Sequence, residues 1–218
     1  MPAATFVKES ATSADPSVAR TRLDKPLAYS GLLDSYTHND LTTVIGTEYE
    51  GLQVVDLLAA KNSDALTRDL AVTISRRGVV FLRNQDVTPQ QMRELMEKIT
   101  ELAGSVRYRP ANDLNATDIL FPQPESSGLH VHPLTEEGSE LGDQISVISS
   151  EKQKKGGGLT HQLSDTSRYA SVGWHSDITF EGAPSDYAML KIHTLPETGG
   201  DTVSVPFVNR TPIMILMT

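Results

Sequence analysis

A histidine and an aspartate two residues apart are the most chemically suggestive feature of this sequence. His175 and Asp177 lie within the segment 173–180. In an extended strand, residues two apart project to the same side, so an imidazole and a carboxylate would face one space. Two histidines and one carboxylate form the facial set that binds non-haem Fe(II) and leaves coordination positions open. The pair supplies two of these three ligands, and the third has to come from elsewhere.

The remaining histidines are weaker candidates for metal ligands. His130 and His132 also share a face in extended backbone, but this spacing fits packed or solvent-facing histidines as well. His38 lies among turn-forming residues and is expected to be exposed. A hydrolytic Zn(II) site built from His130, His132, His175 and Asp177 stays open as a weaker alternative to the Fe(II) site.

Composition describes an acidic globular protein. The 218 residues carry a net charge of -9 with a pI near 5.1, which argues against non-specific binding to nucleic acid or to an anionic membrane. A small anionic ligand can still be held by local basic groups. The absence of cysteine excludes disulfides and thiolate metal ligands, so any metal must bind nitrogen and oxygen. Neither a signal peptide nor an apolar run near the roughly 20 residues of a membrane span is apparent, so we expect a cytoplasmic protein.

Local patterns predict two helices with a strand between them in the N-terminal half of the chain. Apolar residues recur every four positions in 64–76, which is typical of an amphipathic helix. The apolar run 79–82 predicts a buried strand. Thr88, followed by proline and by Gln91 three residues later, predicts a capping box that opens a helix reaching about residue 102.

The second half of the chain favours strands. Alternating apolar and polar residues predict strands over 143–149 and 187–195, the latter including His193, and a further strand starts at 201–205. Turn residues separate the last two, so we expect an antiparallel meander behind the helices. The charged, glycine-ended segment 151–158 is expected to be an exposed loop.

Several stretches together resemble one enzyme family. They are residues 174–180 (WHSDITF), 195–202 (LPETGGDT), 77–85 (RGVVFLRNQ) with the VTP that follows, and 129–133 (LHVHP). In order and spacing they are similar to the taurine dioxygenase family of Fe(II)- and 2-oxoglutarate-dependent oxygenases, over roughly residues 45 to 206. The N-terminal end of this stretch is similar to that of fungal sulfonate dioxygenases.

The resemblance implies a fold and a set of site residues. The fold would be α+β and mainly β, a double-stranded β-helix (jelly roll) with N-terminal helices. His175 and Asp177 match the family's iron ligands and catalytic centre, Thr202 matches the hydroxyl that binds 2-oxoglutarate, and His132 matches the histidine that contacts the sulfonate. The cofactors would be Fe(II), 2-oxoglutarate as cosubstrate and O2. The reaction would hydroxylate a small anionic, taurine-like sulfonate and release sulfite.

The chain also departs from the family pattern. Thr135 and Ser171 stand where taurine-specific members have tyrosine and asparagine, which opens the substrate to other sulfonates, sulfate esters or unrelated acids. The family's second iron histidine and its 2-oxoglutarate arginine lie on later strands, whereas the last such residues here are His193 and Arg210. We therefore expect a C-terminally truncated oxygenase that lacks later barrel strands. The alternative is a catalytically incomplete fragment with a binding or regulatory role.

These observations divide the chain into three parts. Residues 1–25 are expected to be a flexible arm, 26–206 a partial oxygenase domain, and 207–218 a tail without family resemblance. The tail ends in the apolar run 213–217, which is an aggregation hazard unless it packs into the core. No nucleic acid or membrane partner is expected, and homo-oligomer formation stays open.

Overall fold

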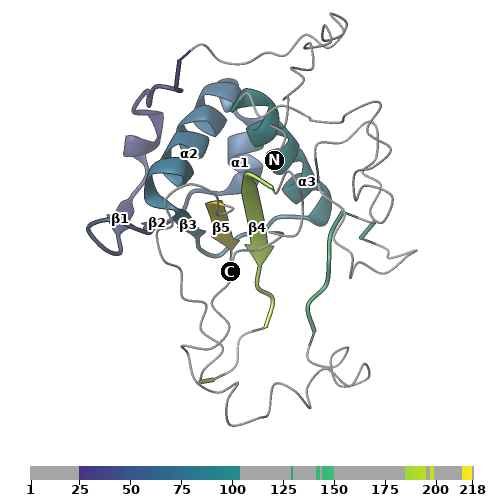
Figure 1. Ribbon diagram of the computed structural model, residues 1–218. Helices are drawn as coiled ribbons and strands as arrows, with labels where there is room; N and C mark the ends of the chain where they lie inside the picture. The colour runs from purple at the N-terminus through teal and green to yellow at the C-terminus, as the bar shows by residue number, and fades with distance from the viewer. Residues whose placement is uncertain are drawn as a thin grey trace, which may run out of the picture.

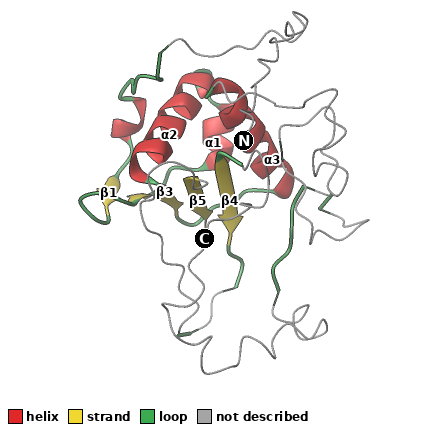
Figure 2. Ribbon diagram, viewed as in Figure 1, coloured by secondary structure: helices red, strands yellow, loops and turns green. Residues whose placement is uncertain are grey.

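The computed structural model places three helices over one face of a five-stranded sheet (Figures 1 and 2). The residues that the structure describes are 25–103, 129, 141–142, 144–149, 185–194, 197–198 and 213–217. The expected arm 1–24, the loop 151–158 and the strand 201–205 lie outside these residues. The 3-10 helix η1 (Leu32–Ser35) precedes the first strand.

The sheet combines strands from both ends of the sequence. Its order is β1-β2-β3-β5-β4. β1 pairs antiparallel with β2, and every other neighbouring pair is parallel. Within the described residues β4 pairs in parallel with β5, and the strand 201–205 that the expected antiparallel meander would place beside it lies outside them. The strands are β1 (His38–Asp40), β2 (Thr47–Tyr49), β3 (Val79–Leu82), β4 (Tyr187–Lys191) and β5 (Ile213–Met217).

Two of the three helices form where the sequence pattern predicts them. α2 (Ser63–Arg77) and α3 (Pro89–Leu102) confirm the predicted helices. Thr88 caps α3 as expected, since its hydroxyl accepts from Gln91 N at 3.3 Å while the Gln91 side chain accepts from Thr88 N at 2.9 Å. The short helix α1 (Val54–Ala59) was not predicted.

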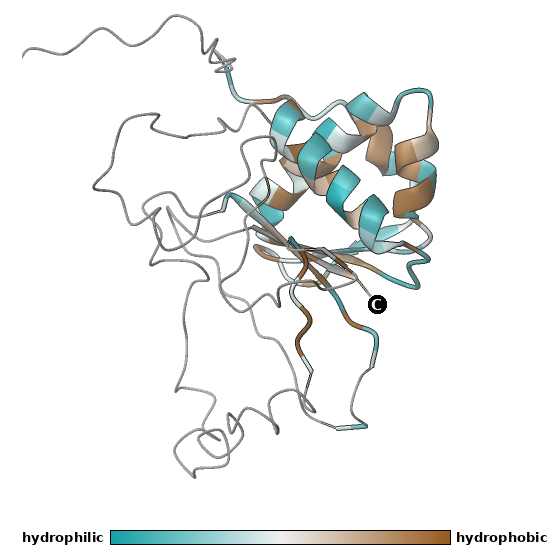
Figure 3. Ribbon diagram, turned by 90° about the vertical axis from the view of Figure 1, so that its right-hand side faces the viewer, coloured by the Kyte–Doolittle hydropathy of each residue, from teal (hydrophilic) through white to brown (hydrophobic). Residues whose placement is uncertain are grey.

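The core lies between the helices and the sheet. Figure 3 shows the helices gathered on one side of the strands, with apolar residues on both layers. Val80 and Leu82 of β3 and Ile215 and Met217 of β5 are at most 1% exposed, and they belong to one cluster with apolar residues of all three helices. The apolar end 213–217 is thus a central strand of the sheet rather than a free tail.

Two other expectations need correction. The described residues 144–149 form no strand, and Val147 and Ile148 are exposed there. The predicted strand 187–195 ends at Lys191, so His193 follows the strand and is exposed. His38 is exposed as expected, but it lies in β1 instead of a loop.

Candidate functional site

The predicted site residues lie outside the described part of the chain. These are the iron ligands His175 and Asp177, the 2-oxoglutarate residue Thr202, and His132 for the substrate. The same holds for His130. Their roles stay predictions, and what the structure describes is the framework to which their segments connect.

The two faces of the sheet differ in chemistry. Tyr49 of β2 and Leu82 of β3 are paired in register and are buried under the helices. Because side chains alternate along a strand, the intervening Glu48 and Phe81 project to the opposite face. In the same register Glu50 lies beside Arg83, one residue past the end of each strand. Charged groups therefore gather on the face away from the helices.

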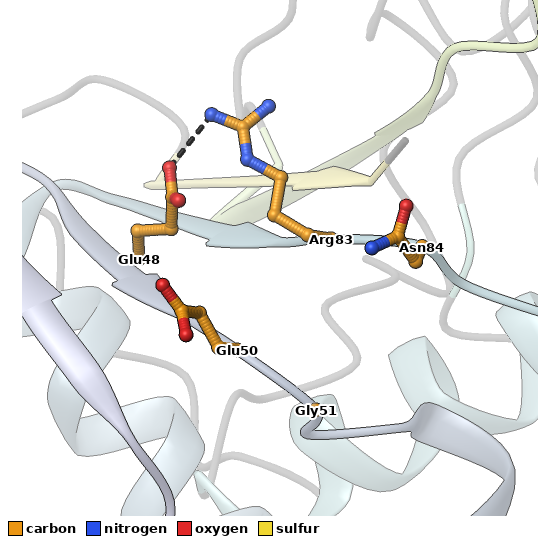
Figure 4. Close-up of a pocket in the computed structure, with 5 residues that line it drawn as sticks. All are labelled: Glu48, Glu50, Gly51, Arg83 and Asn84. Atoms are coloured by element: carbon orange, nitrogen blue, oxygen red, sulfur yellow. Dashed lines mark hydrogen bonds and ion pairs between the residues drawn. The ribbon is translucent and has the colours of Figure 1, made fainter.

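A polar hollow lies at the carboxyl ends of these two strands (Figure 4). Glu48, Glu50, Gly51, Arg83 and Asn84 line it. Arg83 Nη2 donates to Glu48 Oε2 at 2.6 Å, and the Arg83 guanidinium also lies 5.6 Å from the centre of the Phe81 ring. Glu50 is exposed, and its carboxylate has no partner among the described residues. The hollow thus holds two carboxylates and one guanidinium, of which only Glu48 and Arg83 are paired.

Buried amide contacts fix the backbone beneath the hollow. Gln85 is 7% exposed; its side chain accepts from Val54 N at 3.0 Å and donates to Leu52 O at 2.9 Å. Gln53 Nε2 donates to Asn84 O at 2.9 Å. These bonds join the segment after β3 to the segment after β2. Asn84 has φ 52°, a left-handed conformation that asparagine tolerates better than most residues.

The charge of the hollow decides what it can bind. A local excess of carboxylate repels anions, and Arg83 is already paired with Glu48. The hollow therefore does not suit a sulfonate or 2-oxoglutarate. It also holds too few ligands for a metal, and the described residues contain no group of three or more His, Asp or Glu side chains that could hold one. We assign no catalytic role to it.

β4 connects the framework to the predicted iron segment. The strand begins at Tyr187, ten positions after Asp177. Lys191 Nζ donates to Val87 O at 2.7 Å, in the loop before α3. At the other end, the Tyr187 hydroxyl lies 3.3 Å from Ser75 Oγ of α2. Burial raises the pKa of Tyr187; the hydrogen bond with Ser75 partly offsets this effect, and Asp186 adds to it.

The donor set of the predicted site suits Fe(II). A neutral imidazole from His175 and a hard carboxylate from Asp177 are the ligand types of non-haem iron sites. Thr202 offers a hydroxyl donor for a carboxylate, and His132 offers an N–H donor for an oxyanion. None of these groups is a thiolate, in keeping with the absence of cysteine.

Sequence reasoning did not single out the hollow. Its signal was present in Arg83 and Asn84, two polar residues directly after a buried strand. Glu48 belongs to a three-residue strand that the sequence pattern did not reveal, and Glu50 directly follows that strand. Among the described residues, no helix has the length and apolar character needed to cross a membrane.

Comparison with known proteins identifies the family. Residues 37–209 match the family described as "Taurine catabolism dioxygenase TauD, TfdA family". This range contains all four predicted site residues. No solved structure matches the chain significantly.

The curated relatives agree with this match. The chain is 33% identical over 187 residues to an alpha-ketoglutarate-dependent dioxygenase of Penicillium shearii, covering 84% of this chain and 45% of the relative. It is 32% identical over 185 residues to one of Aspergillus oryzae, covering 82% and 47%. A putative alpha-ketoglutarate-dependent sulfonate dioxygenase of Schizosaccharomyces pombe is 26% identical over 81% of this chain and 36% of the relative.

These relatives bear on the expected cofactors and on length. Their names state dependence on alpha-ketoglutarate, which is 2-oxoglutarate, so at the level of the family they confirm the expected requirement for Fe(II), 2-oxoglutarate and O2. The chain spans a little under half the length of the first two. On the family match and these identities, the chain belongs to the taurine catabolism dioxygenase TauD, TfdA family.

Proposed function

We propose that this chain carries an Fe(II)- and 2-oxoglutarate-dependent dioxygenase site, built in a jelly-roll domain, for a small sulfonate-type acid. The observation that carries the proposal is the family match over 37–209, because that range includes His175, Asp177, Thr202 and His132 in family order.

Each proposed residue has a distinct task. His175 and Asp177 would hold Fe(II). Bound there, the iron would supply the oxidising chemistry by which one oxygen atom of O2 enters the substrate as a hydroxyl group and the other enters succinate as 2-oxoglutarate loses CO2. Thr202 donates its hydroxyl hydrogen to a carboxylate oxygen of 2-oxoglutarate. His132 donates an N–H to the anionic group of the substrate and so orients the carbon to be attacked.

That the substrate is a sulfonate is the more specific part of the proposal. A relative named as a sulfonate dioxygenase is found at 25% identity in Saccharomyces cerevisiae and another at 26% in Schizosaccharomyces pombe. The relatives at 32–33% identity have names that specify no substrate. Thr135 and Ser171 depart from the taurine pattern, so we favour an alkyl sulfonate or sulfate ester over taurine itself. Hydroxylation of the carbon bonded to the sulfonate sulfur would give an aldehyde and sulfite.

A second function is favoured by a specific observation. The histidine that follows His175 in these 218 residues is His193, which is exposed in the loop after β4. Two protein ligands hold Fe(II) less firmly than three. The second candidate is therefore a catalytically incomplete form that binds small molecules or an intact relative without turnover.

Product analysis separates the two functions. Purified protein is incubated with Fe(II), 2-oxoglutarate and O2, together with alkyl sulfonates, sulfate esters or carboxylates, and succinate and sulfite are measured. Substrate-stimulated succinate that disappears in His175→Ala and Asp177→Ala, but persists in the matched control His193→Ala, supports the dioxygenase. Without succinate above background for any acid, the incomplete form is the better description of these 218 residues.

A further inference from the structure

We propose that the strand β5 (Ile213–Met217) is a latch that holds β4, the strand that follows the proposed iron ligands in the sequence, on the helix-covered sheet. The strand begins four positions after the family match ends at residue 209. Its role is therefore separate from the family motifs.

The pairing of β5 makes it the central connection. It pairs with β3 from Val79↔Met214 to Leu82↔Met217, and with β4 from Tyr187↔Ile213 to Lys191↔Met217. Within the described residues, β4 has no other strand partner. Ile192 N also donates to Met217 O at 2.9 Å, which extends the contact past the end of β4. Without β5, a gap of one strand would separate β3 from β4 (Figure 1).

Burial gives the latch its strength. Ile215 and Met217 are both 0% exposed and belong to the cluster under the helices. Tyr187 and Met189 of β4, by contrast, are only partly buried against this cluster. The fully buried side chains at this edge therefore come from β5, and β4 is held by its hydrogen bonds to β5 together with the partial packing of Tyr187 and Met189.

Beyond the partial packing of Tyr187 and Met189 on the core, β4 is attached by two single polar contacts. They are the Lys191 ammonium on Val87 O and the Tyr187 hydroxyl near Ser75 Oγ. Partly exposed hydrogen bonds of this kind contribute little net stability. Loss of β5 should thus release β4 while the helices and β1 to β3 stay packed. Because β4 starts ten positions after Asp177, we expect release of β4 to weaken Fe(II) binding by the proposed ligands.

Amide hydrogen exchange with regional resolution tests the latch on the full chain. Met217→Ala removes a fully buried side chain from β5. The matched control Leu57→Ala removes a side chain that is 1% exposed from α1, the helix that packs on α2 and α3. We expect Met217→Ala to speed exchange in 187–191 at least tenfold relative to α2, and Leu57→Ala to leave that ratio unchanged.

Equal acceleration of β4 and α2 in Met217→Ala, or no acceleration of β4, would overturn the latch. If Met217→Ala does not fold, Ile215→Val replaces it, with an expected increase of at least threefold confined to 187–191 and 213–217. A uniform increase in that variant would likewise contradict the proposal.

A second readout connects the latch to the site and rests on the proposed function. Anaerobic Fe(II) binding in the presence of 2-oxoglutarate should weaken at least tenfold in Met217→Ala and stay unchanged in Leu57→Ala. Unchanged Fe(II) affinity in a Met217→Ala protein whose β4 exchanges faster would refute the link to the site. If the wild-type protein binds no Fe(II), the proposed function fails, and the exchange data alone decide the role of β5.

Discussion

Replacing the buried carboxylate of Asp69 by an amide should destabilise the helical layer. Asp69 is 1% exposed in α2 and clamps the segment before η1. Its Oδ1 accepts from Ser30 N at 2.7 Å, and its Oδ2 accepts from Ser30 Oγ at 3.0 Å and from Leu32 N at 2.8 Å. These bonds hold a chain segment 37 to 39 positions away against the helix.

The size of the expected loss in stability follows from the number of hydrogen-bond acceptors that remain at position 69. In Asp69→Asn one oxygen becomes an NH2 donor, which faces a backbone N–H in either amide orientation. The Ser30 hydroxyl can rotate to accept, but one backbone donor loses a charged acceptor in a buried position. Such a loss costs about 2–3 kcal/mol, so the urea midpoint should fall by about 1 M with the m value unchanged.

Urea unfolding followed by circular dichroism measures this effect. The matched control is Asp64→Asn, the same substitution at an exposed position of the same helix, where the carboxylate pairs with Lys98 at 2.7 Å. That variant should unfold close to wild type, since exposed pairs contribute little. A midpoint for Asp69→Asn equal to that of Asp64→Asn would refute the clamp.

Two further predictions concern capping and pH. Thr88→Ala removes the capping box of α3 and should lower the free energy of unfolding by about 0.5–2 kcal/mol in urea, while Thr88→Ser should retain most of it; equal loss in both would contradict the capping role. Burial and the hydrogen bond to Asp34 raise the pKa of Tyr29, so the folded state keeps this proton where the unfolded chain loses it. Stability should therefore fall as pH rises above about 10, and Tyr29→Phe should make the fall shallower; an identical pH profile would show that Tyr29 is not its source.

Features set by nearby residues could be predicted from the sequence. The helix over 64–76 follows from its apolar repeat, and the capping box follows from Thr88 and Gln91. The strand 79–82 is a continuous apolar run, and three of its four residues are buried. In each case the decisive interaction lies within a few positions of the residue that signals it.

Features set by residues far apart in the sequence could not be predicted from the sequence. The strand β4 was recognisable, but its partner β5 lies more than 20 positions further along and pairs in parallel. An apolar run such as 213–217 has the same appearance as a free tail or as a central strand, because only the available space between β3 and β4 distinguishes them. The three-residue strands β1 and β2 are too short for a periodic signal.

Weak local signals explain the remaining differences. α1 begins after Gln53, which makes no side-chain cap, so the usual start signal is absent. In 144–149 the alternation suggested a strand, yet Ile148 is 77% exposed and the backbone is irregular. For the site, residue type and spacing indicate His175 and Asp177, the family resemblance adds Thr202 and His132, and the match over 37–209 confirms the family.

The central claim is that His175 and Asp177 bind Fe(II) and leave room for 2-oxoglutarate. Anaerobic titration of the protein with Fe(II) and 2-oxoglutarate tests it most directly, since chelation of iron by the cosubstrate gives a metal-to-ligand charge-transfer band. We predict a band that is lost in Asp177→Ala and His175→Ala and retained in His193→Ala. Absence of the band in the wild-type protein, or its persistence in Asp177→Ala, would contradict the assignment.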